Sequence, residues 1–272
     1  MIRLTVLGSC GTYPAAGRAC SGYLVEAEAG DRVTRVWIDA GSGTLANLLR
    51  HTALAELDAI WVSHLHIDHT SDLLAANYAI RYGTHKMPPV PVYGPPGWAE
   101  HLRRFLRLRS PDPAFEQAGD VLTQAFQPHE LHDGQRIKLG PLELTAVATV
   151  HSVETYAVRL AADDQVVAYS ADSGPCEALG QLAAGADLFI CEAAWPERLA
   201  STQPAIHLTA RLAGEWAERA GARRLLLTHL RPDADLDDAL KHARGAFGGE
   251  VGLAREGDVV QLGPTPGPGG IP

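Results

Sequence analysis

The chain of 272 residues is 46% hydrophobic and 20% charged, a balance typical of a globular protein with a large buried core, which excludes a disordered chain. Its 23 Lys and Arg residues against 32 Asp and Glu give a formal net charge of -9, so no overall cationic field draws it to nucleic acid, although a local basic patch stays open. The absence of a leader-like segment and of an apolar run of roughly 18 residues predicts a cytoplasmic protein with no membrane partner.

In the first half, short apolar runs separated by turn residues predict strands. They lie at Ile2–Leu7, Gly22–Glu26, Val33–Ile38, Ala59–Val62 and Val90–Tyr93. Helical patterns follow at Ser71–Tyr82 and Gly97–Leu106, and prolines mark the loops around the strand between them. Residues 107–128 carry no clear pattern.

The second half repeats this plan. Strands are predicted at Leu142–Thr149, Tyr156–Leu160, Val166–Ser170, Leu188–Cys191 and Leu225–Leu227, and helices at Pro175–Ala183 and Thr209–Ala220. Because strands precede helices in each half, we expect a sandwich of two sheets with helices outside. We expect residues 1–262 to form a single domain and the Gly/Pro-rich residues 263–272 to form a mobile tail. Four scattered cysteines without a C-x-x-C pair predict reduced thiols.

The densest chemical signal is Ser63-His64-Leu65-His66-Ile67-Asp68-His69, at the end of a predicted strand. It holds four metal-binding side chains in six residues, His64, His66, Asp68 and His69. Neutral imidazoles and a carboxylate suit a borderline ion such as zinc, and a turn between a strand and a helix can converge them. Histidines on a surface loop are the structural alternative, and the density of the motif argues against it.

Three more candidate ligands follow predicted strands in the second half: His151, Asp172 and His229. The resulting seven side chains exceed the three or four that one zinc ion takes from a protein. Two ions that share a carboxylate would account for the number. A lone histidine such as His151 is more often a hydrogen-bonded loop residue, but the recurrence of these side chains at strand ends favours a site on rigid elements.

This constellation resembles the metallo-β-lactamase superfamily. The resemblance implies a four-layer αββα sandwich in the α/β (α+β) class with a dinuclear metal site along one edge. It implies that His64, His66 and His151 hold one ion, that Asp68, His69 and His229 hold the other, and that Asp172 bridges them. The ions would be two divalent cations, zinc or manganese. Asp39 matches the early Asp of the family, which orders the loop beneath the site.

Further segments are similar to the phosphodiesterase branch that includes tRNA 3′-processing endonucleases of the RNase Z type. They are Cys191-Glu192-Ala193, His207-Leu208-Thr209 and Leu226-Leu227-Thr228-His229. His207 precedes a helix N-terminus, which favours a phosphate oxyanion, and Glu192 ends an apolar strand, where an unpaired carboxylate would be costly. A Glu192–His207 pair would therefore supply a general acid, with Asp68 orienting the attacking water. A solvated Glu192 is the structural alternative.

Two substrates compete within this branch. The interval Gly94–Pro128 carries a basic run of His101, Arg103, Arg104, Arg107 and Arg109, but no long Gly-rich hairpin of the kind that grips tRNA. A solvated helix face is the structural alternative for this basic run. The N-terminal Leu7-Gly8-Ser9-Cys10-Gly11 and the segment Glu192-Ala193-Ala194-Trp195 are most similar to the bacterial atypical class II cyclic-nucleotide phosphodiesterases. The expected substrate is thus a small phosphodiester, a 3′,5′-cyclic nucleotide such as cyclic AMP.

Three alternatives stay open. The first is a tRNA 3′-processing endonuclease. The second is a lactone or thioester hydrolase of the same fold, which needs no acid for a ribose oxygen at the place of His207. The third is a non-catalytic, metal-dependent sensor of nucleotides. A homodimer is compatible with this branch, although no heptad or patch in the sequence indicates one.

Overall fold

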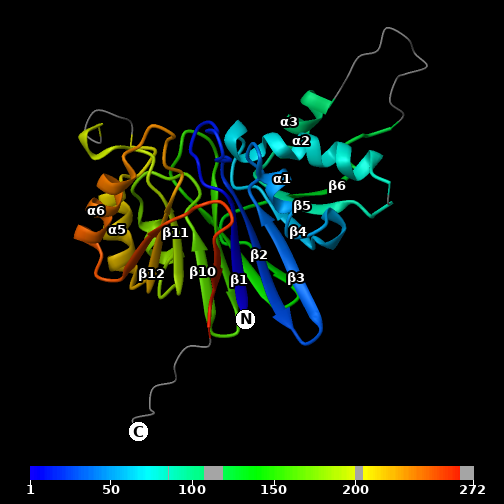
Figure 1. Cartoon of the computed structure of the whole chain (residues 1–272). Helices are drawn as coiled ribbons and strands as arrows, with labels where there is room; N and C mark the ends of the chain where they lie inside the picture. The colour runs from blue at the N-terminus through cyan, green and yellow to red at the C-terminus, as the bar shows by residue number, and fades with distance from the viewer. Residues whose placement is uncertain (85, 107–118, 200–204, 264–272) are drawn as a thin grey trace.

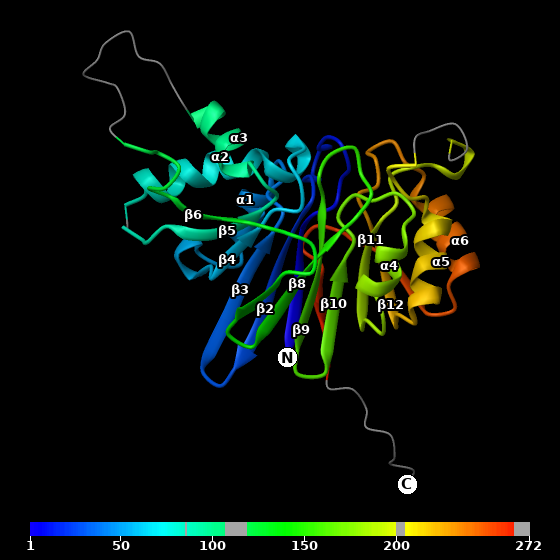
Figure 2. The same ribbon diagram turned by 180° about the vertical axis from the view of Figure 1, so that it is seen from behind.

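The computed structural model describes residues 1–84, 86–106, 119–199 and 205–263. In these residues the chain forms two mixed β-sheets packed face to face, with helices on both outer faces (Figures 1 and 2). The predicted four-layer sandwich is thereby confirmed. Residues 264–272, which make up nearly all of the predicted tail, lie outside the described residues, as do Arg107 and Arg109 of the basic run.

The first sheet has seven strands within the described chain. In spatial order they are β14 (Val259–Gln261), β1 (Ile2–Gly8), β2 (Gly22–Ala29), β3 (Arg32–Ile38), β4 (Ala59–Trp61), β5 (Val90–Gly94) and β6 (Phe126–Glu130). The strands from β3 to β6 run parallel to one another. The sequence analysis predicted no strand at β14, which comes from the end of the chain and pairs with β1.

The second sheet also has seven strands among the described residues. In spatial order they are β13 (Glu250–Leu253), β12 (Arg224–Thr228), β11 (Leu188–Glu192), β10 (Gln165–Tyr169), β9 (Tyr156–Ala162), β8 (Leu142–Ala148) and β7 (Arg136–Leu139). Strands β10 to β13 are parallel, and β8 runs in the same direction because β9 is antiparallel to both β8 and β10. The strands β8, β10, β11 and β12 therefore end at one edge.

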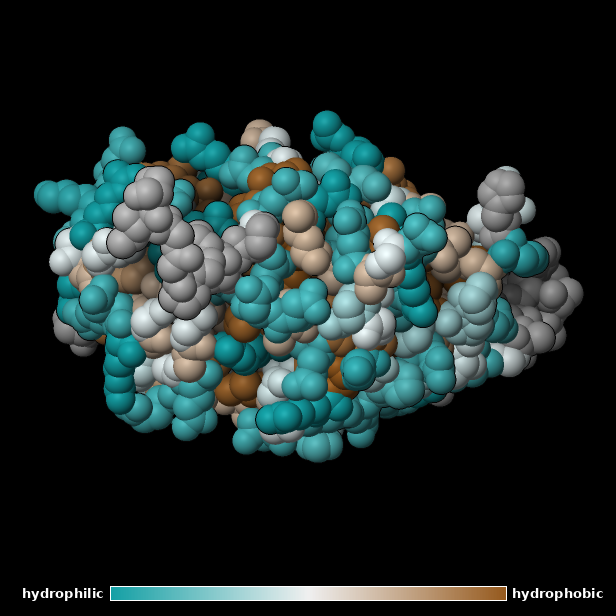
Figure 3. All heavy atoms as spheres, turned by 90° about the horizontal axis from the view of Figure 1, so that it is seen from below, coloured by the Kyte–Doolittle hydropathy of each residue, from teal (hydrophilic) through white to brown (hydrophobic). Residues whose placement is uncertain are grey.

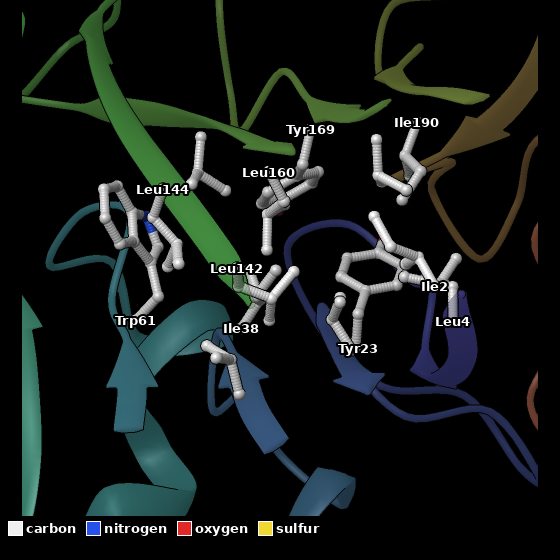
Figure 4. Close-up of a cluster of buried hydrophobic side chains, with 14 of the residues drawn as sticks. Ile2, Leu4, Tyr23, Ile38, Trp61, Leu142, Leu144, Leu160, Tyr169 and Ile190 are labelled. Carbon is white, nitrogen blue, oxygen red and sulfur yellow. The ribbon is translucent and has the colours of Figure 1, made fainter. Parts of the chain in front are cut away.

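Apolar side chains fill the space between the sheets and the space beneath each helical layer. Between the sheets, Tyr23, Ile38 and Trp61 of the first sheet face Leu160 and Tyr169 of the second (Figure 4). Strands buried on both faces read as nearly continuous apolar runs, which is why the sequence located most of them. Hydrophilic side chains cover most of the face seen from below (Figure 3).

Helices cover both outer faces. They are α1 (Thr44–Leu48), α2 (Ile67–Tyr82) and α3 (Trp98–Leu106) on the first sheet, and α4 (Glu177–Leu182), α5 (Ala210–Ala220) and α6 (Leu236–Ala246) on the second (Figure 1). The prediction for α5 is confirmed, since Thr209 caps it by accepting from the N–H of Leu212 and Gly221 ends it in a left-handed conformation at φ 64. None of the described helices combines the length and the apolar character that a membrane span requires.

The sequence misplaced one boundary that matters for the site. Helix α2 begins at Ile67, four residues before its predicted start, with His66 at its N-cap. Asp68 and His69 thus lie in the first turn, where an ionised carboxylate is stabilised by the helix dipole.

Candidate active site

The predicted site residues meet at the upper edge of the sandwich in Figure 1, where strands of both sheets end. The first sheet contributes the segments after β3 and β4, and the second contributes those after β8, β10, β11 and β12. These segments carry Asp39, the His64–His69 motif, His151, Asp172, His207 and His229 in that order, and Glu192 is the last residue of β11. Strand ends of a rigid sandwich therefore hold groups that are far apart in sequence.

The potential ligands form two groups. In each group, atoms that can bind a metal lie within 4.8 Å of one another: His64, His66, His151 and Asp172 in one, and Asp68, His69 and His229 in the other. Asp172 also faces the second group, with Oδ1 3.3 Å from Nε2 of His69 and Oδ2 3.3 Å from Nε2 of His229. All seven residues named from the sequence are thus brought together, with Asp172 between the two groups.

Hydrogen bonds away from the centre fix the imidazoles. Nδ1 of His69 lies 2.7 Å from Oδ2 of Asp39, and Nδ1 of His151 lies 2.9 Å from the carbonyl oxygen of Ile206. Both oxygens can only accept, so each Nδ1 carries a proton, and in a neutral imidazole Nε2 then presents a lone pair. Ser63 donates to Asp39 and accepts from Nδ1 of His64, with the same result for that ring. This outer shell is typical of metal-binding histidines.

Unsatisfied polar atoms also fit a bound cation. Among the described residues, Nε2 of His69 and Oδ1 of Asp172 are buried and, although 3.3 Å apart, have no hydrogen-bond partner of suitable geometry, which is costly for polar atoms. Nε2 of His64 and Nε2 of His151 lie 3.1 Å and 3.2 Å from Nδ1 of His66. Since the first two nitrogens present lone pairs, three nitrogens converge on one point as ligands do. The donor set of imidazoles and carboxylates suits zinc or a similar ion.

The electrostatics agree with this interpretation. Burial lowers the pKa of His64, His66 and His151, which keeps these imidazoles neutral. Although burial opposes its charge, His229 and His69 hold the pKa of Asp172 well below its usual value. Burial likewise opposes the charge of His69, but Asp172 and Asp39 raise its pKa well above the ordinary value. A cation bound between these carboxylates would supply the same positive charge.

Glu192 and His207 form a second unit beside the ligand groups. Oε1 of Glu192 lies 2.8 Å from Nδ1 of His207 and accepts from the N–H of Ser173, and Oε2 accepts from the N–H of Ala194. These bonds satisfy the buried carboxylate, so the solvated alternative for Glu192 is wrong. Burial lowers the pKa of His207, but Glu192 outweighs it and raises that pKa to about 9.

His207 has a second possible role. Its Nδ1 lies 4.0 Å from Oδ2 of Asp172, and His207 forms a further group of potential ligands with Asp172 and His229. Metal content therefore has to be measured when His207 is changed.

Two close approaches were not predicted. An added Cβ at Gly11 would lie 2.5 Å from the carbonyl oxygen of His229, and one at Gly41 would lie 2.1 Å from that of Asp68. Side chains at these positions would displace the ligand loops. Asp39 and His229 have left-handed backbones, at φ 53 and φ 55, a conformation that residues other than glycine adopt at a cost.

Tyr169 and Ser63 support Asp39, and the sequence had assigned neither of them a role. Tyr169 donates to Oδ2 of Asp39 at 2.9 Å, and Ser63 donates to the same oxygen through its hydroxyl and to Oδ1 through its backbone N–H. A signal for Tyr169 existed, since a tyrosine in an apolar strand needs a partner for its hydroxyl.

The family model described as "Beta-lactamase superfamily domain" matches residues 34–230. An uncharacterised protein of Mycobacterium leprae is 32% identical over 268 residues, which cover 96% of this chain and 89% of that protein. The probable metallo-hydrolase YhfI of Bacillus subtilis is 32% identical over 264 residues, which cover 95% of this chain and 99% of YhfI. The crystal structure of YhfI aligns with a TM-score of 0.79 and 30% identity over 96% of this chain and 100% of that one. Ribonuclease Z of Halorubrum lacusprofundi is 28% identical over 306 residues, which cover 96% of this chain and 97% of the enzyme.

The position of Asp172 leads to a prediction about metal content. In Asp172→Asn, the metal content of purified protein should fall for both groups, because the residue faces each of them and the amide loses the negative charge. Elemental analysis after dialysis against a buffered metal supply measures the change.

Asp187→Asn is the matched control, because Asp187 holds the N–H of Val166 at the far end of β11 from the site. If Asp172→Asn keeps the wild-type metal content, or if Asp172→Asn and Asp187→Asn lose equal amounts of metal, Asp172 does not join the two groups.

Proposed function

The chain belongs to the β-lactamase superfamily and is a metallo-hydrolase of that fold, and on this premise we propose that it is a phosphodiesterase that converts a 3′,5′-cyclic nucleotide to its 5′-monophosphate. The observation that carries the proposal is the Glu192–His207 pair, with 2.8 Å between Oε1 and Nδ1. Breaking a phosphodiester expels an alkoxide of high basicity, and a positioned acid lowers that barrier. The resemblance to the RNase Z branch and the relatives named ribonuclease Z support the same class of reaction.

We assign two divalent cations, zinc or manganese, to the cluster. His64, His66 and His151 would hold one, Asp68, His69 and His229 the other, and Asp172 both. Bound there, the cations would supply a water of lowered pKa and neutralise charge on the phosphate.

The remaining catalytic roles fall to residues of the chain itself. The contacts of Asp68 with the N–H of Thr12 and with His229 use Oδ2, which leaves Oδ1 to orient the attacking water. The N-terminus of α5, which begins three residues beyond His207, favours the negative phosphate oxygens. As the bond from phosphorus to the ribose 3′ oxygen breaks, His207 gives its proton to that oxygen. Glu192 holds the imidazole in place and stabilises its cationic form.

A tRNA 3′-processing endonuclease is the second candidate, and the full-length similarity to ribonuclease Z favours it. Two observations favour the cyclic nucleotide over this candidate. The described arginines of the basic run are engaged on the surface of the protein, Arg103 with Asp120 at 2.7 Å and Arg104 with Glu100 at 3.8 Å. The formal charge of -9 also opposes a large polyanion.

Parallel assays at physiological salt test the ranking. Turnover of 3′,5′-cyclic AMP should exceed cleavage of a 3′-extended precursor tRNA by the same preparation, because the proposed site contacts a single phosphodiester. Turnover of the cyclic nucleotide should also change little with salt, since steep salt dependence comes from many phosphate contacts. Efficient, strongly salt-sensitive tRNA cleavage without cyclic-nucleotide turnover would reverse the ranking. Inactivity toward both, with metal bound, would favour the sensor or the lactone and thioester alternatives.

The variant His207→Ala tests acid catalysis. Turnover of 3′,5′-cyclic AMP should fall by roughly 10²- to 10⁴-fold, the range for loss of a positioned acid. A diester that releases p-nitrophenolate needs little protonation, so its hydrolysis should fall much less. Metal content should stay at the wild-type level, and Glu192→Gln should show the same pattern more weakly.

Two results would contradict this role. Loss of metal from His207→Ala would make the residue a ligand, as its contact with Asp172 allows. An equal loss of rate on both substrates would make it a binding residue.

A further inference from the structure

A cavity of about 370 Å³ lies beside the site, between helix α6 and the loops that follow β11 and β12. Its wall includes Ala194 and Trp195, which closely follow Glu192, and Leu230 and Arg231, which follow His229. The cavity therefore lies next to the candidate ligands, at the carboxyl ends of the same parallel strands. Its volume lies in the range of small-molecule pockets, and this edge is where α/β sheets bind ligands.

Trp195 belongs to both the cavity and the site. The residue lines the cavity, and its ring stands nearly perpendicular to the ring of His207, at 87° and with 5.1 Å between centroids. Its backbone N–H donates to the carbonyl oxygen of Leu208, which fixes the residue against the start of α5. The ring is thus held at the boundary between the cavity and the proposed acid.

The charges on the wall disfavour a second phosphate. The acidic side chains outnumber the guanidinium groups, with Glu197, Asp233, Asp235 and Asp238 against Arg198 and Arg231. Arg231 is paired with Asp233 at 3.1 Å, and His242 with Asp238 at 3.4 Å. Besides these charged groups, the wall holds the aromatic residue Trp195 and apolar side chains that include Ala194, Leu230 and Ala239. Such a pocket suits a flat, uncharged group.

We propose that this cavity binds the nucleobase of the substrate, stacked on Trp195, while the phosphodiester lies at the His/Asp cluster. The inference rests on the proposed function, because it assigns the nucleoside end of the same substrate. Trp195 is then a specificity-determining residue, and the acidic wall selects an uncharged ring over a second phosphate.

Kinetics on two cyclic phosphodiesters test the stacking. Trp195→Ala should raise KM for 3′,5′-cyclic AMP by roughly 5- to 100-fold, the range for loss of one base–aromatic stack. KM for an abasic ribose 3′,5′-cyclic phosphate should change less than about twofold, and Trp195→Phe should restore most of the loss. A KM for cyclic AMP that stays at the wild-type value in Trp195→Ala would overturn the proposal and leave the phosphodiesterase function standing.

A second variant fills the cavity without touching the cluster. Ala239→Phe on α6 should abolish binding of adenosine, which has no phosphate, as measured by equilibrium dialysis. Ala79→Phe, the same change at an exposed position of α2, is the control and should bind as the wild type does. If the protein hydrolyses no cyclic diester, the proposed function fails, and the dialysis still decides on the cavity. Adenosine binding that is absent from the wild type, or unchanged in Ala239→Phe, would overturn the proposal.

Discussion

The buried carboxylate of Asp39 is the interaction on which the rest of the site depends. Its Oδ2 takes hydrogen bonds from Nδ1 of His69 and from the hydroxyls of Ser63 and Tyr169, and its Oδ1 takes the N–H of Ser63. Tyr169 belongs to the second sheet and the other donors follow β4 of the first. One carboxylate therefore joins both sheets at the edge where they carry the candidate ligands, and turns Nε2 of His69 and, through Ser63, Nε2 of His64 inward.

This arrangement separates charge along the site. Carboxylate oxygens of Asp39, Asp68 and Asp172 lie 2.7 to 3.7 Å from ring nitrogens of His69 and His229. Their negative charge creates a place for cations. Glu192 contacts a different imidazole, because its carboxylate accepts hydrogen bonds from two backbone N–H groups and from His207. A metallo-hydrolase needs both a cation-binding cluster and, for a basic leaving group, a proton source outside it. The two carboxylate systems meet at Asp172, which lies within 4.0 Å of His207.

The sequence predicted the layers and named the side chains that the fold brings together, because both leave local signals. Apolar runs mark strands buried on two faces, and the histidine motif is dense enough to stand out within one turn. Helix α6 was missed, although Asp235 caps it, because the acidic run around the cap reads as a loop. The place of β14 and the link from Tyr169 to Asp39, 130 residues apart, depend on pairing across the fold that no local pattern encodes. The left-handed backbone of Asp39 and His229 is equally a product of tertiary structure.

The affinity for metal of Asp39→Asn tests this account most directly. Asparagine keeps the size of the side chain but replaces an ionised acceptor with a neutral amide, so His69 and Ser63 lose the group that orients them. Zinc affinity, measured by competition with a chelating dye, should fall roughly 10- to 100-fold, the range for loss of an outer-shell partner, while circular dichroism stays native. Asp187→Asn should retain the wild-type affinity. Wild-type zinc affinity in folded Asp39→Asn would contradict the claim that this carboxylate organises the metal site.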